Sequence, residues 1–193
     1  MSPYWIVSDM KIALLPEYFF PHVGGMETWT YEVARELSRR GQEVSVFTYK
    51  AHGHEDSKST NGFRIVRNGP FYVDRSHSYI RRALSLSTGL PKSLLRERFD
   101  RYLASPSLLL LCRSLRSWPL FSVWHGWYGL KYAVASKGLM KGLARTVIEQ
   151  AALQTETDGT IAVARHLKDL LLGKNPRLDE REVHVVHGGV NLG

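Results

Sequence analysis

The chain has 193 residues, of which 44% are hydrophobic and 23% are charged, so it suits one good-sized domain and is not mostly disordered. No run of about 18 apolar residues occurs, and we therefore expect no membrane-spanning helix. The net charge of +8 favours anionic partners such as nucleic acid, phosphorylated small molecules or an anionic membrane. The single cysteine, Cys112, lies in an apolar run, where we expect it to be a buried core residue.

The N-terminal part predicts a strand, a helix and a second strand. Residues 11–15 form a short apolar run, and apolar side chains then recur at helical spacing from Met26 until Gly41, a typical helix stop. Residues 44–48 are predicted to form the second strand. Such a βαβ unit builds parallel sheets with right-handed crossovers. We treat residues 1–9 as a short N-terminal extension and residues 10–193 as one domain, because Met10 reads like a natural start.

The remaining chain continues to alternate between strands and helices. Further strands are predicted over residues 63–66, 99–104, 119–124, 160–164 and 182–187. Helices are predicted within residues 71–98 and over residues 107–116, 139–151 and 167–172, with Ser105 and Pro106 as a helix start and Gly173 as a stop. Residues 51–61 are polar and are predicted to form a loop. This order predicts an α/β fold, a doubly wound, mostly parallel Rossmann-like sheet.

Two glycines, Gly24 and Gly25, lie where the first strand turns into the first helix. Glycine tolerates positive φ and lets a ligand approach the backbone, and the helix N-terminus offers free N–H groups to an anion. The pair therefore indicates a phosphate- or sugar-binding edge, although a plain tight turn would look the same. The pattern G-x-G-x-x-G is absent, and Tyr49 and Lys50 stand where a ribose-binding acid would follow the second strand, which argues against a dinucleotide-dependent oxidoreductase.

The segment from Phe20 to Thr48 resembles the opening of family-4 glycosyltransferases of the GT-B fold. The matching positions are Pro21, Gly24, Gly25, Glu27, Ala34, Leu37, Arg40, Gly41, Glu43 and Val44. The resemblance extends over about residues 11–191. It implies one half of a GT-B architecture, in which Gly24, Gly25 and Glu27 contact the phosphates of the donor and the acceptor.

A second segment, residues 121–128, ends a strand with His125. A histidine there lies at the ligand-binding edge of an open α/β sheet, but on its own it could equally cap the strand. The resemblance implies that His125 is the catalytic-site histidine, which contacts the transferred sugar or positions the acceptor. Gly126, Trp127 and Tyr128 follow it and are predicted to contact substrate.

Two later segments match the family less completely. Glu149, Asp158 and residues 161–163 fit its pattern, but Ala164 stands where the family has a serine that caps the next helix. Near the end of the chain, His187 and Gly188 replace a proline and an asparagine, and Asn191 replaces an aspartate.

Basic residues are concentrated between residues 75 and 101. They are Arg75, Arg81, Arg82, Lys92, Arg96, Arg98 and Arg101, against Glu97 and Asp100. Docking on anionic lipid at the inner face of a membrane is one interpretation, and a solvated helix face is the other. No nucleic-acid-binding motif is recognisable, so we expect no nucleic acid partner.

The resemblance implies an N-terminal, acceptor-side domain of a retaining glycosyltransferase, with a nucleotide sugar as co-substrate and a glycan or a lipid-linked acceptor. The single cysteine, which cannot form an internal disulfide, fits a cytoplasmic setting. No other cofactor and no metal is expected. The family's second domain supplies most of the nucleotide-sugar site, so we expect this chain alone to be inactive. The alternative is a non-catalytic GT-B-like partner that regulates a full-length enzyme.

Overall fold

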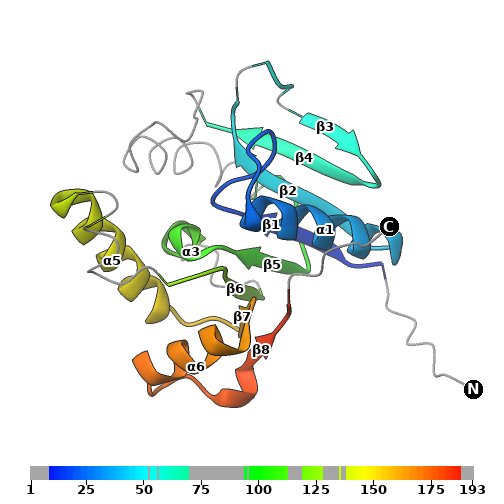
Figure 1. The fold of residues 1–193 in the computed structure, drawn as a ribbon. Helices are drawn as coiled ribbons and strands as arrows, with labels where there is room; N and C mark the ends of the chain where they lie inside the picture. Colours follow the sequence, from blue (N-terminus) through cyan, green and yellow to red (C-terminus); the bar gives the residue numbers. More distant parts are fainter. Residues whose placement is uncertain are drawn as a thin grey trace, which may run out of the picture.

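The computed structural model describes residues 9–51, 53–55, 57–69, 94, 96–112, 119–127, 135 and 138–187. Its strands form one eight-stranded sheet in the order β3-β4-β2-β1-β5-β6-β7-β8 (Figure 1). The strands are β1 (Lys11–Leu15), β2 (Glu43–Tyr49), β3 (Ser57–Thr60), β4 (Phe63–Asn68), β5 (Arg101–Ala104), β6 (Leu120–Trp124), β7 (Gly159–Ala162) and β8 (Val183–Val185). Only β3 and β4 pair antiparallel, which confirms the predicted doubly wound, mostly parallel sheet.

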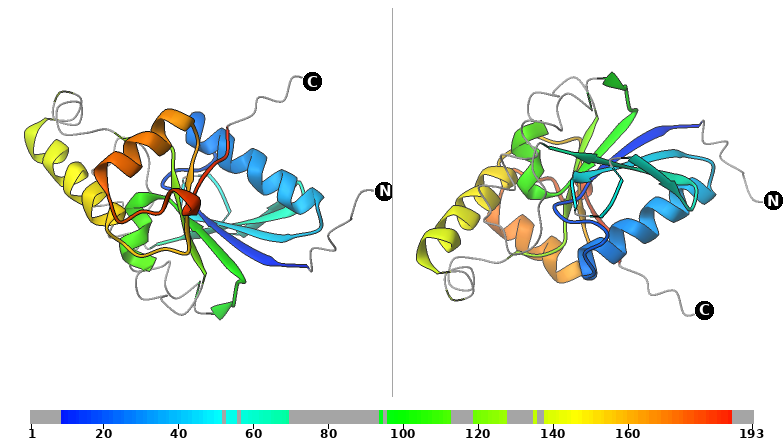
Figure 2. Two further views of the ribbon diagram at one scale, coloured as in Figure 1. Left: turned by 90° about the horizontal axis from the view of Figure 1, so that it is seen from below. Right: turned by 90° about the horizontal axis from the view of Figure 1, so that it is seen from above.

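Helices cover both faces of the sheet (Figure 2). They are α1 (Gly25–Arg39), α3 (Pro106–Cys112), α5 (Leu139–Leu153) and α6 (Arg165–Lys174), with a short 3₁₀ helix, η2, at Glu180–Glu182. Buried residues of α3, α5 and α6 share one hydrophobic cluster, whereas Ala34 of α1 belongs to another. None of the helices within the described ranges is both long and apolar enough to cross a membrane.

The alternation of side chains along β1 produces these two clusters. Ile12 and Leu14 pack with α1, and Ala13 and Leu15 pack with the cluster on the opposite face. Helix α1 ends as predicted, because Gly41 adopts φ 85° and donates its N–H to the Ser38 carbonyl at 2.9 Å. Gln42 donates to the Leu37 carbonyl at 3.1 Å, which completes a Schellman motif.

The prediction of a loop over residues 51–61 is wrong in part, because Ser57–Thr60 is strand β3. It is a polar edge strand, half of a hairpin with β4. Asn61 (φ 47°) and Gly62 (φ 86°) make the two-residue turn of this hairpin. Positive φ at both positions is what a type I′ turn requires.

Other boundaries differ by a few residues. Gly173 does not stop α6, which continues to Lys174. The last strand is only three residues long, because Glu182 belongs to η2 and the strand ends at Val185. Ser105 precedes α3, but its hydroxyl donates to the Leu15 carbonyl at 3.2 Å and so joins α3 to the end of β1. Cys112 is buried, as expected. Residues 1–8 of the N-terminal extension, residues 113–118 and most of the predicted helix within 71–98 lie outside the described residues.

Candidate functional site

The carboxyl ends of the parallel strands form one edge of the sheet, where the predicted site residues gather. β1 lies between β2 and β5, so the chain winds in opposite directions on its two sides. Ligands of open α/β sheets bind outside the carboxyl ends at such a switch point. The loop between β1 and α1, residues 16–24, leaves the sheet here, and His125 follows β6 at the same edge.

The loop of residues 16–24 is fixed by contacts from several elements. The Tyr49 hydroxyl of β2 donates to the Glu17 carbonyl, and Arg67 Nη2 of β4 donates to the Phe20 carbonyl at 2.8 Å. Phe19 is buried, with its ring edge against Phe63 at 6.4 Å between centroids. These contacts hold the backbone before the double glycine in one position, as a binding loop requires.

A buried ionic network ties the same loop to α5. Arg145 Nη1 lies 2.8 Å from Glu17 Oε1 and 3.0 Å from Oε2, and Arg145 Nε lies 2.9 Å from Glu149 Oε1. Side-chain exposure is 12% for Arg145, 6% for Glu17 and 2% for Glu149. Burial alone would lower the pKa of Arg145, but the two carboxylates outweigh it and raise the pKa, so the guanidinium stays charged.

The N-terminus of α1 is open to a ligand. Gly24 is the N-cap in an extended conformation, and no side chain caps the helix. A Cβ at Gly25 would meet no atom within 4 Å, so the space beside this backbone is free. Neither glycine adopts positive φ, so glycine is not required here for a left-handed backbone; the lack of a side chain instead allows a ligand to approach the backbone closely. An uncapped helix start of this kind is suited to an anion.

His125 packs against the first turns of α1. Its ring meets the Trp29 ring edge to face, with centroids 4.9 Å apart. Burial lowers the pKa of His125 to about 4, against the opposing effect of the Glu27 carboxylate, so the imidazole is neutral at pH 7. A neutral imidazole carries one donor and one acceptor nitrogen and can therefore hold a substrate hydroxyl.

His125 lines a small cavity. The cavity is also lined by Trp29, Thr30 and Ser105 together with apolar residues of β1, β5 and β6. The indole N–H of Trp29 is buried and has no partner in the part of the chain that the structure describes. The unpaired donor, next to the imidazole, is available to a water or to a ligand hydroxyl.

The residues after His125 are placed differently from one another. Gly126 has open space around it. Trp127 stacks on Trp124 with centroids 5.6 Å apart, and Lys174 Nζ lies 5.2 Å from its ring centre. These contacts give Trp127 a packing role, independent of any stacking on a sugar. Tyr128 lies outside the described residues.

The described part of the predicted basic surface does not lie at the carboxyl edge of the sheet. Arg96 and Arg98 are exposed and precede β5, close to Asp100. The Lys11 N–H donates to Asp100 Oδ2 at 2.8 Å, at the first residue of β1. Both arginines therefore lie near the amino ends of the strands, opposite the candidate site. The other predicted positions, Arg75, Arg81, Arg82 and Lys92, fall outside the described residues.

Sequence reasoning did not identify Glu17 or Trp29 as site residues. The i, i+4 pair of Arg145 and Glu149 is visible in the sequence, but its third member is 128 residues away from Arg145. No three His, Cys, Asp or Glu side chains in the described ranges lie close enough together to hold a metal ion.

Comparisons with known proteins agree with this fold. The family model of Glycosyltransferase Family 4 matches residues 23–193. Sucrose-phosphate synthase from Thermosynechococcus elongatus is similar in structure, with TM-score 0.71 and 18% identity over 95% of this chain and 49% of that one. A UGT transferase from Siraitia grosvenorii, solved in complex with UDP, has TM-score 0.62 and 11% identity over 95% of this chain and 52% of that one.

No protein with a curated description matches the sequence significantly. The chain spans about half the length of these two solved structures, whose low identities establish the fold alone. The family match covers most of the chain and includes the double glycine, His125 and α5. The protein therefore belongs to glycosyltransferase family 4, and its α/β domain corresponds to the N-terminal half of the GT-B architecture.

Proposed function

We propose that the chain is the acceptor-side half of a retaining, nucleotide-sugar-dependent glycosyltransferase that acts on a glycan or a lipid-linked acceptor. The observation that carries this proposal is the meeting of the uncapped α1 N-terminus, open at Gly25, with the neutral His125 at one edge of the sheet. The first accepts a phosphate, and the second holds a hydroxyl of the transferred sugar or of the acceptor.

Sugar transfer needs two electrostatic tasks to be completed together. The leaving nucleoside diphosphate must be stabilised, and the acceptor hydroxyl must be held in line with the anomeric carbon. The loop of residues 16–24 and His125 supply acceptor positioning and part of the phosphate contact. A second domain, such as the other half of the similar structures, supplies the rest, so the chain alone has no turnover and binds donor weakly.

The test is a titration of the chain with UDP- and GDP-sugars, in which binding is measured by calorimetry or by NMR. We expect a Kd of the order of 1 mM for the preferred donor, and a roughly tenfold loss in Gly25→Ala, because the added methyl occupies the ligand's space. Gly173→Ala is the matched control, since a methyl group added at Gly173 in α6 also meets no atom within 4 Å yet lies away from the site.

Two results would contradict the proposal. Equal donor affinities for Gly25→Ala and Gly173→Ala would place the nucleotide elsewhere. Tight binding accompanied by sugar release from the unmodified chain would show that this domain carries a complete donor site.

A further inference from the structure

Helix α5 exposes its apolar side. The exposed fractions are 62% for Leu139, 79% for Met140, 40% for Leu143 and 64% for Val147. Leu139, Leu143 and Val147 are spaced four residues apart, so they lie on successive turns of one helix face. Ala144, on the same outer side, is exposed as well. The result is a continuous apolar stripe about two turns long, open to solvent.

The ionic network prevents the helix from turning this stripe inward. Arg145 and Glu149 occupy the buried side of α5, where they bind each other and Glu17. A rotation that buried Met140 or Val147 would break these ion pairs. Of the large hydrophobic residues that are exposed in the described ranges, four belong to α5 and the others are Phe20, Val23 and Val186. The stripe is therefore a fixed feature of this surface.

The sequence around the start of α5 carries only positive charges. Residues 128–144 contain Lys131, Lys137 and Lys141 and no aspartate or glutamate, whereas the charge of Arg145 is compensated inside by Glu17 and Glu149. Lys141 lies within α5, and Lys137 precedes the helix by two residues. Apolar side chains on an exposed helix face, accompanied by lysines without acids, are typical of helices that lie in the interface of an anionic bilayer.

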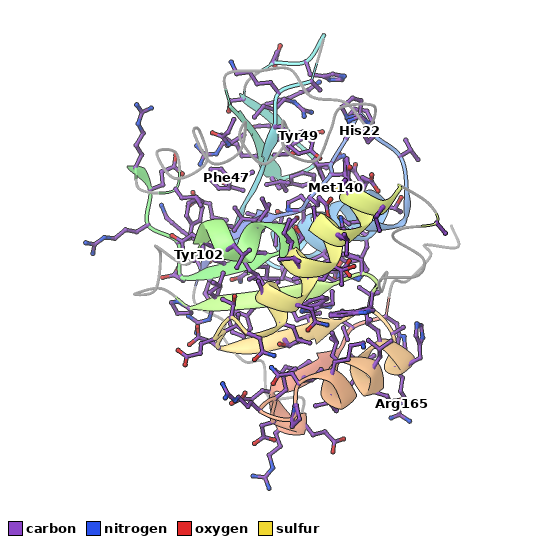
Figure 3. All side chains as sticks on the ribbon, turned by 90° about the vertical axis from the view of Figure 1, so that its left-hand side faces the viewer. His22, Phe47, Tyr49, Tyr102, Met140 and Arg165 are labelled. Carbon is purple, nitrogen blue, oxygen red and sulfur yellow. The ribbon has the colours of Figure 1, made fainter. Side chains whose placement is uncertain are left out.

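The position of α5 suits such a contact. Its N-terminal end projects beyond the carboxyl ends of the strands, on the side of the molecule where the candidate site lies (Figure 1). In Figure 3, which faces this side, α5 crosses the front of the view and Met140 lies near its outer end. The stripe and the double-glycine loop therefore share one side of the domain.

We propose that the outer face of α5 docks on an anionic lipid bilayer, with Leu139, Met140, Leu143 and Val147 entering the headgroup region. The positive charge of residues 128–144 and the net charge of +8 select the anionic surface over a neutral one. This docking face does not depend on the proposed transfer reaction, because it stands on the exposure and charge of α5. It would bring the candidate site close to the membrane, where a lipid-linked acceptor would be found.

The first experiment measures flotation of the chain with phosphatidylcholine vesicles and with vesicles in which a quarter of the lipid is phosphatidylglycerol. We expect binding to the anionic vesicles, weakened by added salt. The triple variant Met140→Gln, Leu143→Gln, Val147→Gln should reduce the partition coefficient by about tenfold or more, because the apolar part of the contact is removed. Val186→Gln, a similarly exposed site at the end of β8, should bind as the unmodified chain does.

The second experiment reports the contact directly. Cys112 is the only cysteine and is buried, and burial raises the pKa of its thiol to about 12, so a thiol-reactive dye will label an introduced cysteine selectively. Met140→Cys carrying an environment-sensitive dye should brighten and shift to the blue on anionic vesicles. Val186→Cys, labelled in the same way, should not change. Circular dichroism of each variant checks that the fold is kept.

Three results would overturn the docking face. The first is no vesicle binding by the unmodified chain. The second is vesicle binding that the triple variant retains in full. The third is self-association of the chain in sedimentation experiments that the triple variant abolishes while vesicles have no effect, which would assign the stripe to a second copy. Donor binding is measured separately, so none of these results bears on the sugar-nucleotide site.

Discussion

Helices α1 and α5 have the same length, fifteen residues, and opposite arrangements of side chains. α1 keeps its ion pairs in solvent: Glu36 bonds Arg39 and Arg40 on the surface, while Ala34 packs inside. α5 buries Arg145 and Glu149 and exposes Leu139, Met140, Leu143 and Val147, while Ala152 and Leu153 at its C-terminal end pack inside. Exposed ion pairs contribute little to stability, whereas a buried charge must be paired because its desolvation is costly. The comparison shows that α5 is held inside by its ion pairs together with the packing of Ala152 and Leu153, and that the apolar stripe of its N-terminal part is left for another surface.

The largest expected effect comes from breaking the buried network. Arg145→Met leaves two buried carboxylates without their partner and should lower the free energy of unfolding by about 3–5 kcal/mol. Arg39→Met, on the exposed α1 pair, should change it by less than about 1 kcal/mol. Urea denaturation followed by circular dichroism measures both. Similar losses of unfolding free energy in the two variants would mean that the buried ion pairs of α5 do not differ in importance from the exposed pairs of α1.

Replacing all three charged residues of the network by neutral ones tests whether the loss comes from the unpaired carboxylates. Combining Glu17→Gln, Arg145→Met and Glu149→Gln removes every charge, so most of the loss seen in Arg145→Met should be recovered. A further loss in the triple variant would mean that the ion pairs themselves, and not the uncompensated carboxylates, account for the effect.

The next effect concerns His125, which packs on α1. Its pKa in the folded protein is about 4, below the ordinary value of 6.5. The unfolded chain therefore binds the proton more readily between these values, and stability should be full above about pH 6.5 and fall towards pH 4. With allowance for the partial exposure of His125, this titration should lower the free energy of unfolding by about 2 kcal/mol.

Denaturation midpoints at pH 7 and pH 4.5 measure this dependence. In His125→Asn the pH-dependent loss should be smaller by that amount, while the contributions of the other titrating groups remain. An unchanged pH dependence would show that His125 is solvated.

A smaller effect is expected at the start of α6. Ala164 is its N-cap, has an extended backbone and makes no side-chain hydrogen bond to the helix. Ala164→Ser supplies a hydroxyl for a free N–H and should raise the free energy of unfolding by about 1 kcal/mol. Ala144→Ser, on the exposed side of α5, should lower it slightly, because serine is the poorer helix former. A loss of stability in Ala164→Ser would mean that its hydroxyl cannot reach the helix.

The smallest effect is expected from Gly25→Ala on stability. The added methyl meets no atom within 4 Å, so the free energy of unfolding should stay within about 0.5 kcal/mol of the unmodified value. Thermal denaturation measures this. A large loss would mean that Gly25 is needed for the fold, and its loss of donor binding could then not be assigned to the ligand.

Local patterns in the sequence predicted much of the fold. The apolar run of β1, the periodicity of α1 and the stop at Gly41 each depend on neighbouring residues, and the structure has them where expected. β3 was not predicted, because it is short, polar and at the sheet edge. Its signal was present in Asn61 and Gly62, a pair that favours a tight hairpin turn.

The candidate site was predicted less completely. Periodicity identifies α5 as a helix but does not say which side is buried. Here Leu139, Met140, Leu143 and Val147 face solvent, because Arg145 and Glu149 take the inner side along with Ala152 and Leu153. The contact of Arg145 with Glu17 depends on the tertiary fold and has no local signature. The role of Trp127 is similar: only the structure shows that it packs on Trp124.

The proposed function requires the nucleotide sugar to bind at the N-terminus of α1 beside His125. Amide chemical-shift mapping of the ¹⁵N-labelled chain, titrated with UDP- and GDP-sugars, tests this requirement directly. We expect the largest shifts at the amides of Gly25, Met26 and Glu27 and smaller ones at His125 and Gly126, all on one binding curve. Shifts concentrated instead around α6 and β8, with these amides unmoved, would contradict the proposed site.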